Sequence, residues 1–147
     1  MDRRELTRKI IAAKNANGLT WKEIASKLDR APAYATAALL GQMALSADEA
    51  EQAGGILGLS ADEARLLTEI PYRGALEQTP PTDPLIYRFY EIVQVFGTTL
   101  KSLIEEEFGD GIMSAIDFEM HVERVPDPKG DRVKVTLNGK FLPYRRY

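Results

Sequence analysis

The hydrophobic pattern of the chain changes at Gly109–Asp110–Gly111, and this change limits the fold more than any other feature. Before the glycines, apolar residues recur at helical spacing. After them, apolar and polar residues alternate over residues 116–123 and again over 133–137, as in β-strands with one buried face. Two or three strands form too small a sheet to be stable alone in water. We therefore expect an α+β protein whose sheet is completed by another chain, which makes it an obligate oligomer.

Residues 1–70 are predicted to form a bundle of short helices. Three capping boxes, each a Ser or Thr followed three residues later by Glu, mark helix starts at Thr20, Ser46 and Ser60. Pro32 is well placed in the first turn of another helix, with Gly41 as its stop. The first expected helix has Leu6, Ile10 and Ala13 on one face and ends over residues 15–18, and the other four cover residues 21–28, 32–40, 47–56 and 61–70.

The second half is predicted to begin with a proline-rich segment, residues 71–84, which forms a linker or an ordered crossing arm. Asp83 is the expected cap of a long helix that begins at Pro84 and ends near Glu107. Strands follow, with turns expected at residues 126–131 and at Asn138–Gly139. The predicted domains are therefore 1–74 and 75–147.

Composition excludes several kinds of site. The chain has no cysteine and a single histidine, His121, so disulfides, thiolate zinc sites, iron–sulfur clusters and multi-histidine metal sites are not expected. A formal charge of −3 argues against a protein that covers nucleic acid through non-specific contacts with phosphates. The N-terminal residues lack the apolar run of a secretory signal, and no stretch is long enough to span a membrane, so we expect a cytoplasmic protein.

The order of the first five helices is similar to that of the helix-turn-helix domains of phage repressors. The helix that would read DNA, residues 31–40, contains no Arg, Lys, Asn or Gln to contact base edges or phosphates. Residues 1–70 hold nine basic and ten acidic side chains. Packing of this alanine-rich helix against a neighbour is the better interpretation, and a DNA-binding regulator with a C-terminal oligomerisation domain is the alternative.

Two segments are candidates for chemistry. Arg88 and Glu91 are three residues apart on the predicted long helix, so they share a face and can form an ion pair. Most such pairs are ordinary surface salt bridges, but Arg88 stands between aromatic residues, where partial desolvation makes a guanidinium a strong anion site. Ser114 follows the glycine turn and supplies a hydroxyl, although an incidental serine in a helix-to-strand turn is the simpler interpretation.

Four segments of the sequence, in this order, resemble the cyanases, a family also called cyanate hydratases or cyanate lyases. They are Thr36–Gln42, Asp83–Lys101, Phe108–Ile116 and Gly139–Pro143. The resemblance extends over essentially the whole chain, and only the final residues, Tyr144–Tyr147, match no motif of the family.

This resemblance implies that the protein decomposes cyanate with bicarbonate to ammonia and carbon dioxide, through carbamate and without a metal or organic cofactor. It also implies that Arg88, Glu91 and Ser114 are the catalytic residues, and that Ile112 and Leu142 line the substrate site. Cyanate and bicarbonate are then the small-molecule partners, and neither nucleic acid nor membrane is expected as a partner.

The family resemblance also carries expectations about architecture. The first domain is expected to be repressor-like without binding DNA, and the second to interlock with the same domain of a partner subunit. Five such dimers are expected to form a homodecamer with active sites at subunit interfaces. This agrees with the incomplete sheet inferred from the alternating pattern, although the number ten comes only from the resemblance.

Overall fold

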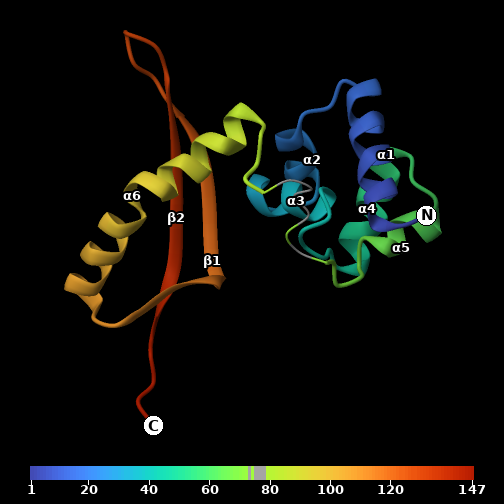
Figure 1. Cartoon of the computed structure of the whole chain (residues 1–147). Helices are drawn as coiled ribbons and strands as arrows, with labels where there is room; N and C mark the ends of the chain where they lie inside the picture. Colours follow the sequence, from blue (N-terminus) through green and yellow to red (C-terminus); the bar gives the residue numbers. More distant parts are fainter. Residues whose placement is uncertain (73, 75–78) are drawn as a thin grey trace. The chain divides into compact units, whose positions relative to one another are not determined.

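The computed structural model describes residues 1–72, 74 and 79–147, and its described part combines six helices with one two-stranded sheet (Figure 1). The strands β1 and β2 are consecutive in the chain and pair as a hairpin. The elements are α1 (Arg3–Ala16), α2 (Trp21–Lys27), α3 (Pro32–Leu39), α4 (Ala47–Leu57), α5 (Ala61–Leu66), α6 (Pro84–Phe108), β1 (Gly111–Val125) and β2 (Arg132–Pro143).

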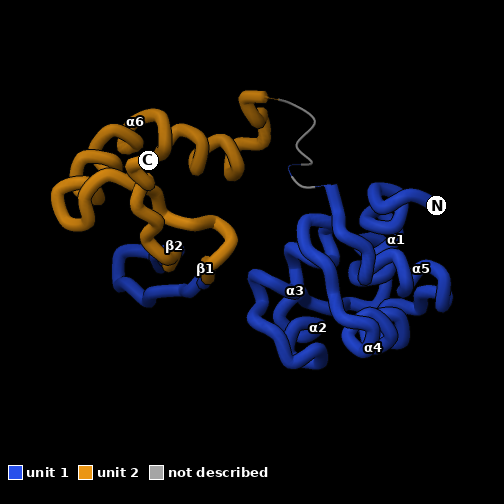
Figure 2. Tube along the Cα trace, turned by 90° about the horizontal axis from the view of Figure 1, so that it is seen from below, with its two compact units in different colours: residues 1–75, 121–135 blue, residues 76–120, 136–147 orange. Residues whose placement is uncertain are grey.

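Two compact units make up the chain (Figure 2). One contains Met1–Ala75 with His121–Val135, and the other contains Leu76–Met120 with Thr136–Tyr147. The predicted linker over 71–84 falls partly on residues 73 and 75–78, which lie outside the described residues. The division into domains 1–74 and 75–147 therefore stays a prediction, whereas the expected start of the long helix at Asp83 and Pro84 is confirmed.

The hydrophobic core of the described chain lies among α1 to α5. Leu6 and Ile10 of α1, Ile24 of α2 and Leu39 of α3 are fully buried there. All three predicted capping boxes are present, and Asp2 with Glu5 forms a fourth at the start of α1. Each box satisfies amide groups that have no partner within their own helix, so these short helices are stabilised at their ends as well as by packing. The fifth helix ends at Leu66, four residues before the predicted end.

Glu49 is a nearly buried carboxylate at the start of α4. Its Oε2 accepts a hydrogen bond from the backbone N–H of Ser46 at 2.8 Å, and its Oε1 forms an ion pair with the Arg30 guanidinium. The Ser46 N–H foremost, and then Arg30, hold the pKa of Glu49 below its ordinary value, although burial opposes them. Glu49 therefore stabilises the helical bundle in its charged form.

The stability of the bundle is expected to fall in acid. Because the pKa of Glu49 is lowered on folding, its contribution is complete above about pH 4.3 and is lost as the pH falls through the folded-state value. Glu49→Gln should lower the free energy of unfolding at pH 7 by about 1–2 kcal/mol and weaken the acid dependence. Thermal unfolding followed by the fluorescence of Trp21, the single tryptophan, reports on this unit. Glu51→Gln, at an exposed position of the same helix, is the control and should change neither the free energy of unfolding at pH 7 nor its dependence on acid.

The helix α6 and the hairpin have almost no core of their own. No residue of the 25-residue α6 is buried, and Ser114 is the one buried residue of β1. Ile116, expected on a buried strand face, is 98% exposed. In the single chain, the alternating pattern therefore has no buried face, because two strands supply no second layer to cover it.

The predicted turn at Asn138–Gly139 is wrong, because both residues lie within the continuous strand β2. Alternation in fact continues from Leu137 through Gly139 to Phe141, with glycine in an apolar position. A Cβ atom at Gly139 would overlap the carbonyl oxygen of Ser114 and lie 2.6 Å from Met113 Cγ. Glycine stands here because the two strands approach closely, not because the chain turns.

Candidate active site

Arg88 and Glu91 lie on successive turns of α6, and the structure brings them together. Arg88 Nη1 donates a hydrogen bond to Glu91 Oε2 at 3.0 Å, as their spacing predicts. Their side chains are 61% and 48% exposed, so the expected desolvation of Arg88 is not present within one chain. The other guanidinium N–H groups of Arg88 point to no protein acceptor among the described residues, and they remain available for an anion.

Aromatic rings lie beside this ion pair. The Arg88 guanidinium carbon lies 5.8 Å from the centre of the Tyr87 ring. The Tyr87 and Tyr90 rings are themselves 6.1 Å apart, centre to centre, and tilted by 34°. A positive charge at this distance is attracted by the electron-rich face of the ring. Arg88 therefore has one partner in a carboxylate and another in an aromatic ring.

Ser114 lies near the start of β1 and is 4% exposed. Its Oγ accepts hydrogen bonds from the backbone N–H groups of Ile116 and Asp117, both at 3.0 Å. A hydroxyl has two acceptor lone pairs and one proton, so these amides occupy both lone pairs and leave the proton to be donated. The arrangement suits a hydroxyl that donates to an anion.

Ile112 and Leu142 are both exposed, on strands β1 and β2. Gly111, the residue before Ile112, lies so close to β2 that a Cβ atom would overlap the Leu142 carbonyl oxygen and lie 2.5 Å from the Phe141 ring. The backbone N–H of Tyr144 donates to the Asp110 carbonyl at 3.1 Å, and Phe108 stacks on Phe141. These contacts hold the start of β1 against the end of β2.

Gly139→Ala is expected to disturb this part of the hairpin. The added methyl group meets strand backbone at Ser114, which cannot move away as a flexible side chain does. We expect a loss of about 1–3 kcal/mol in the free energy of unfolding. Gly55→Ala, where a Cβ atom meets nothing within 4 Å, is the matched control for thermal unfolding. Equal melting temperatures for the two variants would contradict the close approach.

Of the five predicted site residues, the described structure joins only Arg88 and Glu91 by a side-chain hydrogen bond. Among the residues that the structure describes, no hydrogen bond or ion pair joins Ser114 to Arg88 or Glu91. Sequence reasoning missed the contribution of Gly139, for which the unbroken alternation was an available signal. It expected the aromatic neighbours of Arg88 to desolvate the guanidinium, but it did not predict the contact with the Tyr87 ring.

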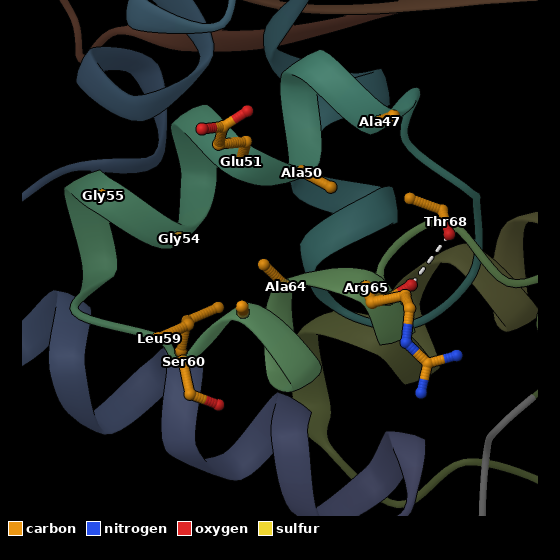
Figure 3. A pocket seen from close by; sticks show the side chains of 11 residues that line it. Ala47, Ala50, Glu51, Gly54, Gly55, Leu59, Ser60, Ala64, Arg65 and Thr68 are labelled. Carbon is orange, nitrogen blue, oxygen red and sulfur yellow. Dashed lines mark hydrogen bonds between the residues drawn. The ribbon is translucent and has the colours of Figure 1, made fainter.

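An open hollow of about 640 Å³ lies between α4 and α5 in the helical bundle (Figure 3). Small residues such as Ala50, Gly54 and Ala64 line it, and its two charged lining residues are Glu51 and Arg65. None of the predicted site residues belongs to it. Within the described ranges, no cluster of three or more His, Cys, Asp or Glu is placed to hold a metal. No helix of the described chain has the length and hydropathy needed to cross a bilayer.

Comparison with known proteins identifies the family. A model described as the cyanate lyase C-terminal domain matches residues 78–146, and one described as the N-terminal domain of cyanate hydratase matches residues 3–71. The chain belongs to the cyanate lyase family. The resemblance inferred from the sequence motifs is thereby confirmed, and family membership makes the chain an enzyme, a lyase.

Individual relatives agree with the family over the full length. Proteins named cyanate hydratase from Polaromonas sp. and Methylibium petroleiphilum are each 56% identical over 147 residues, which is 100% of both chains. The crystal structure of cyanase from T. urticae matches with a TM-score of 0.82 and 41% identity, over 94% of this chain and 96% of that one. The fold described above is therefore that of a solved cyanase.

Proposed function

We propose that this cyanate lyase family member decomposes cyanate with bicarbonate to ammonia and carbon dioxide, with Arg88, Glu91 and Ser114 as its catalytic residues. The single observation that carries the proposal is the full-length match to proteins named cyanate hydratase. The site chemistry supports it, because a guanidinium with free donors and a hydroxyl with a free proton are both suited to anions.

We also propose that the active site forms between subunits of an oligomer. The many large apolar side chains exposed on α6 and on the hairpin support this, since monomers rarely leave large apolar patches in water. The lack of contact between Ser114 and the Arg88–Glu91 pair in one chain is also consistent with a shared site. A repressor-like first domain, an interlocked dimer and a decamer of five dimers remain the expected architecture.

The reaction brings together two anions, and their mutual repulsion must be offset by fixed positive charge. Arg88 is permanently protonated and presents parallel N–H donors, and arginines of neighbouring subunits add further charge. Holding the two reactants in the correct orientation is itself a large part of such catalysis, because a bimolecular reaction in solution becomes a reaction between two bound groups.

The chemical steps balance without a redox partner. An oxygen of bicarbonate attacks the carbon of cyanate, and the cyanate nitrogen takes up two protons, one from bicarbonate and one from the surroundings. The adduct breaks into carbon dioxide and carbamate, and carbamate, on further protonation at nitrogen, releases ammonia and a second carbon dioxide. In our proposal Ser114 donates a hydrogen bond to one anion, and Arg88 binds the anionic substrates and neutralises their charge. Glu91 either orients Arg88 or moves a proton to the cyanate nitrogen. Ile112 and Leu142 would line the site and exclude water.

The decisive experiment measures ammonia released from cyanate by the purified protein, with and without bicarbonate. We expect release only when both anions are present. The same reaction in buffer freed of carbon dioxide is the control, because dissolved carbon dioxide supplies bicarbonate. Failure to release ammonia with both anions present would overturn the proposal.

A further inference from the structure

We propose that Tyr87 is a positioning residue that holds the Arg88 guanidinium, through the face of its ring, in the orientation needed to bind anionic substrate. This inference rests on the proposed function, since it concerns the same site. It goes further by assigning a role to an aromatic side chain outside the Arg88, Glu91 and Ser114 set.

The geometry of α6 makes the contact possible. Neighbouring residues on a helix point about 100° apart, whereas residues three or four apart share a face. Glu91 therefore lies between the directions of Tyr87 and Arg88 around the helix. When Arg88 bends toward Glu91 to form the 3.0 Å hydrogen bond, its guanidinium is carried toward Tyr87, and the structure has it 5.8 Å from the ring centre.

The ring itself is supported from the next turn. Tyr90 lies three residues after Tyr87, and their ring centres are 6.1 Å apart. Aromatic pairs at this separation favour tilted arrangements such as the 34° observed here. Contact with Tyr90 therefore restrains the Tyr87 ring beside the guanidinium.

Arg88 needs such support because its side chain is long and mostly exposed. An arginine that must present its planar donors to a ligand loses rotamer freedom, and an exposed ion pair alone restrains it weakly. Contact with Glu91 on one side and Tyr87 on another restrains both the position and the plane of the guanidinium. Pre-organisation of this kind lowers the cost of binding an anion.

The test compares Tyr87→Leu with Tyr87→Phe. Leucine keeps an apolar side chain but has no ring, whereas phenylalanine keeps the ring face and removes only the hydroxyl. We expect Tyr87→Leu to lower kcat/KM for cyanate about tenfold relative to the wild type. Tyr87→Phe should keep kcat/KM within about twofold of the wild-type value. Azide, a linear monovalent anion shaped like cyanate, should inhibit competitively, and its inhibition constant should rise in Tyr87→Leu by a similar factor.

Two measurements separate positioning from a general structural effect. Size-exclusion chromatography and thermal unfolding should give the wild-type oligomer and melting temperature for both variants. Tyr72→Leu, at a fully exposed tyrosine of the other compact unit, is the control for the substitution itself and should leave kcat/KM unchanged.

Several outcomes would overturn the inference. Wild-type kinetics and azide binding in Tyr87→Leu would show that the ring does not act on Arg88. Equal losses in the Leu and Phe variants would assign the effect to the hydroxyl, and a lost oligomer in both would assign it to assembly. In each case the wild-type protein still releases ammonia from cyanate, so failure of this inference is distinct from failure of the proposed function.

Discussion

Arg88→Lys is expected to lower kcat by about two to three orders of magnitude while leaving the oligomer intact. The substitution keeps the positive charge but replaces a planar group with several parallel donors by a compact ammonium. Lysine therefore neutralises an anion without fixing its plane, and it also loses the contact with Tyr87 described above. Steady-state ammonia release gives kcat, and size-exclusion chromatography checks the assembly.

The control for this substitution is Arg124→Lys. Arg124 also forms an exposed ion pair, with Asp131 at 2.9 Å, but it belongs to no predicted site. We expect its activity to match the wild type. If Arg88→Lys retained most of its turnover, the role of Arg88 would be charge alone, and the argument from planar donors would be wrong.

Phe96→Asp is expected to abolish both assembly and activity. Phe96 lies in the middle of α6 and is 53% exposed in the single chain. Burial of one such ring at an interface contributes about 2–3 kcal/mol, and a carboxylate in its place adds the cost of removing a charge from water. Symmetry repeats the change in every subunit, so its effects accumulate. Light scattering gives the mass of the particle, and ammonia release gives the activity.

Gln94→Asp tests whether the effect depends on the apolar surface rather than on added charge. Gln94 lies two residues before Phe96, about 200° away around the same helix. We expect this variant to assemble and to turn over cyanate. An intact, active oligomer of Phe96→Asp would show that this part of α6 is not buried between subunits. The exposed apolar residues of α6 include Leu85, Phe89, Ile92, Val93, Phe96, Leu100 and Leu103.

Local signals in the sequence predicted the helices well. Each helix start depends on interactions among residues within one turn, so a few neighbouring residues are enough to predict it. This holds for the capping boxes at Thr20, Ser46 and Ser60 and for the start at Asp83–Pro84. The prediction of a turn at Asn138–Gly139 was wrong for a related reason. The same two residues suit a tight turn or a close strand approach, and only the position of β1 decides between them.

The candidate site was less accessible to sequence reasoning. Spacing alone predicted the Arg88–Glu91 ion pair, which the structure confirms, but gave it no function. The amide contacts of Ser114 depend on the backbone path after Gly111, which alternation does not define. The choice of these residues came from resemblance to a family, because in the proposed arrangement the site is shared between chains and leaves no spacing pattern within one chain.

The uneven distribution of the core also bears on the order of events during synthesis. The helical bundle has buried leucines and isoleucines near the N-terminus, so it can fold while the ribosome is still making α6. In the proposed oligomer, the later half gains its burial only on meeting another subunit. A newly made chain therefore has a folded first half and a second half with exposed apolar residues until it assembles with another subunit. During that interval the protein is most exposed to aggregation and to proteases, and the local supply of sister chains determines how long it lasts.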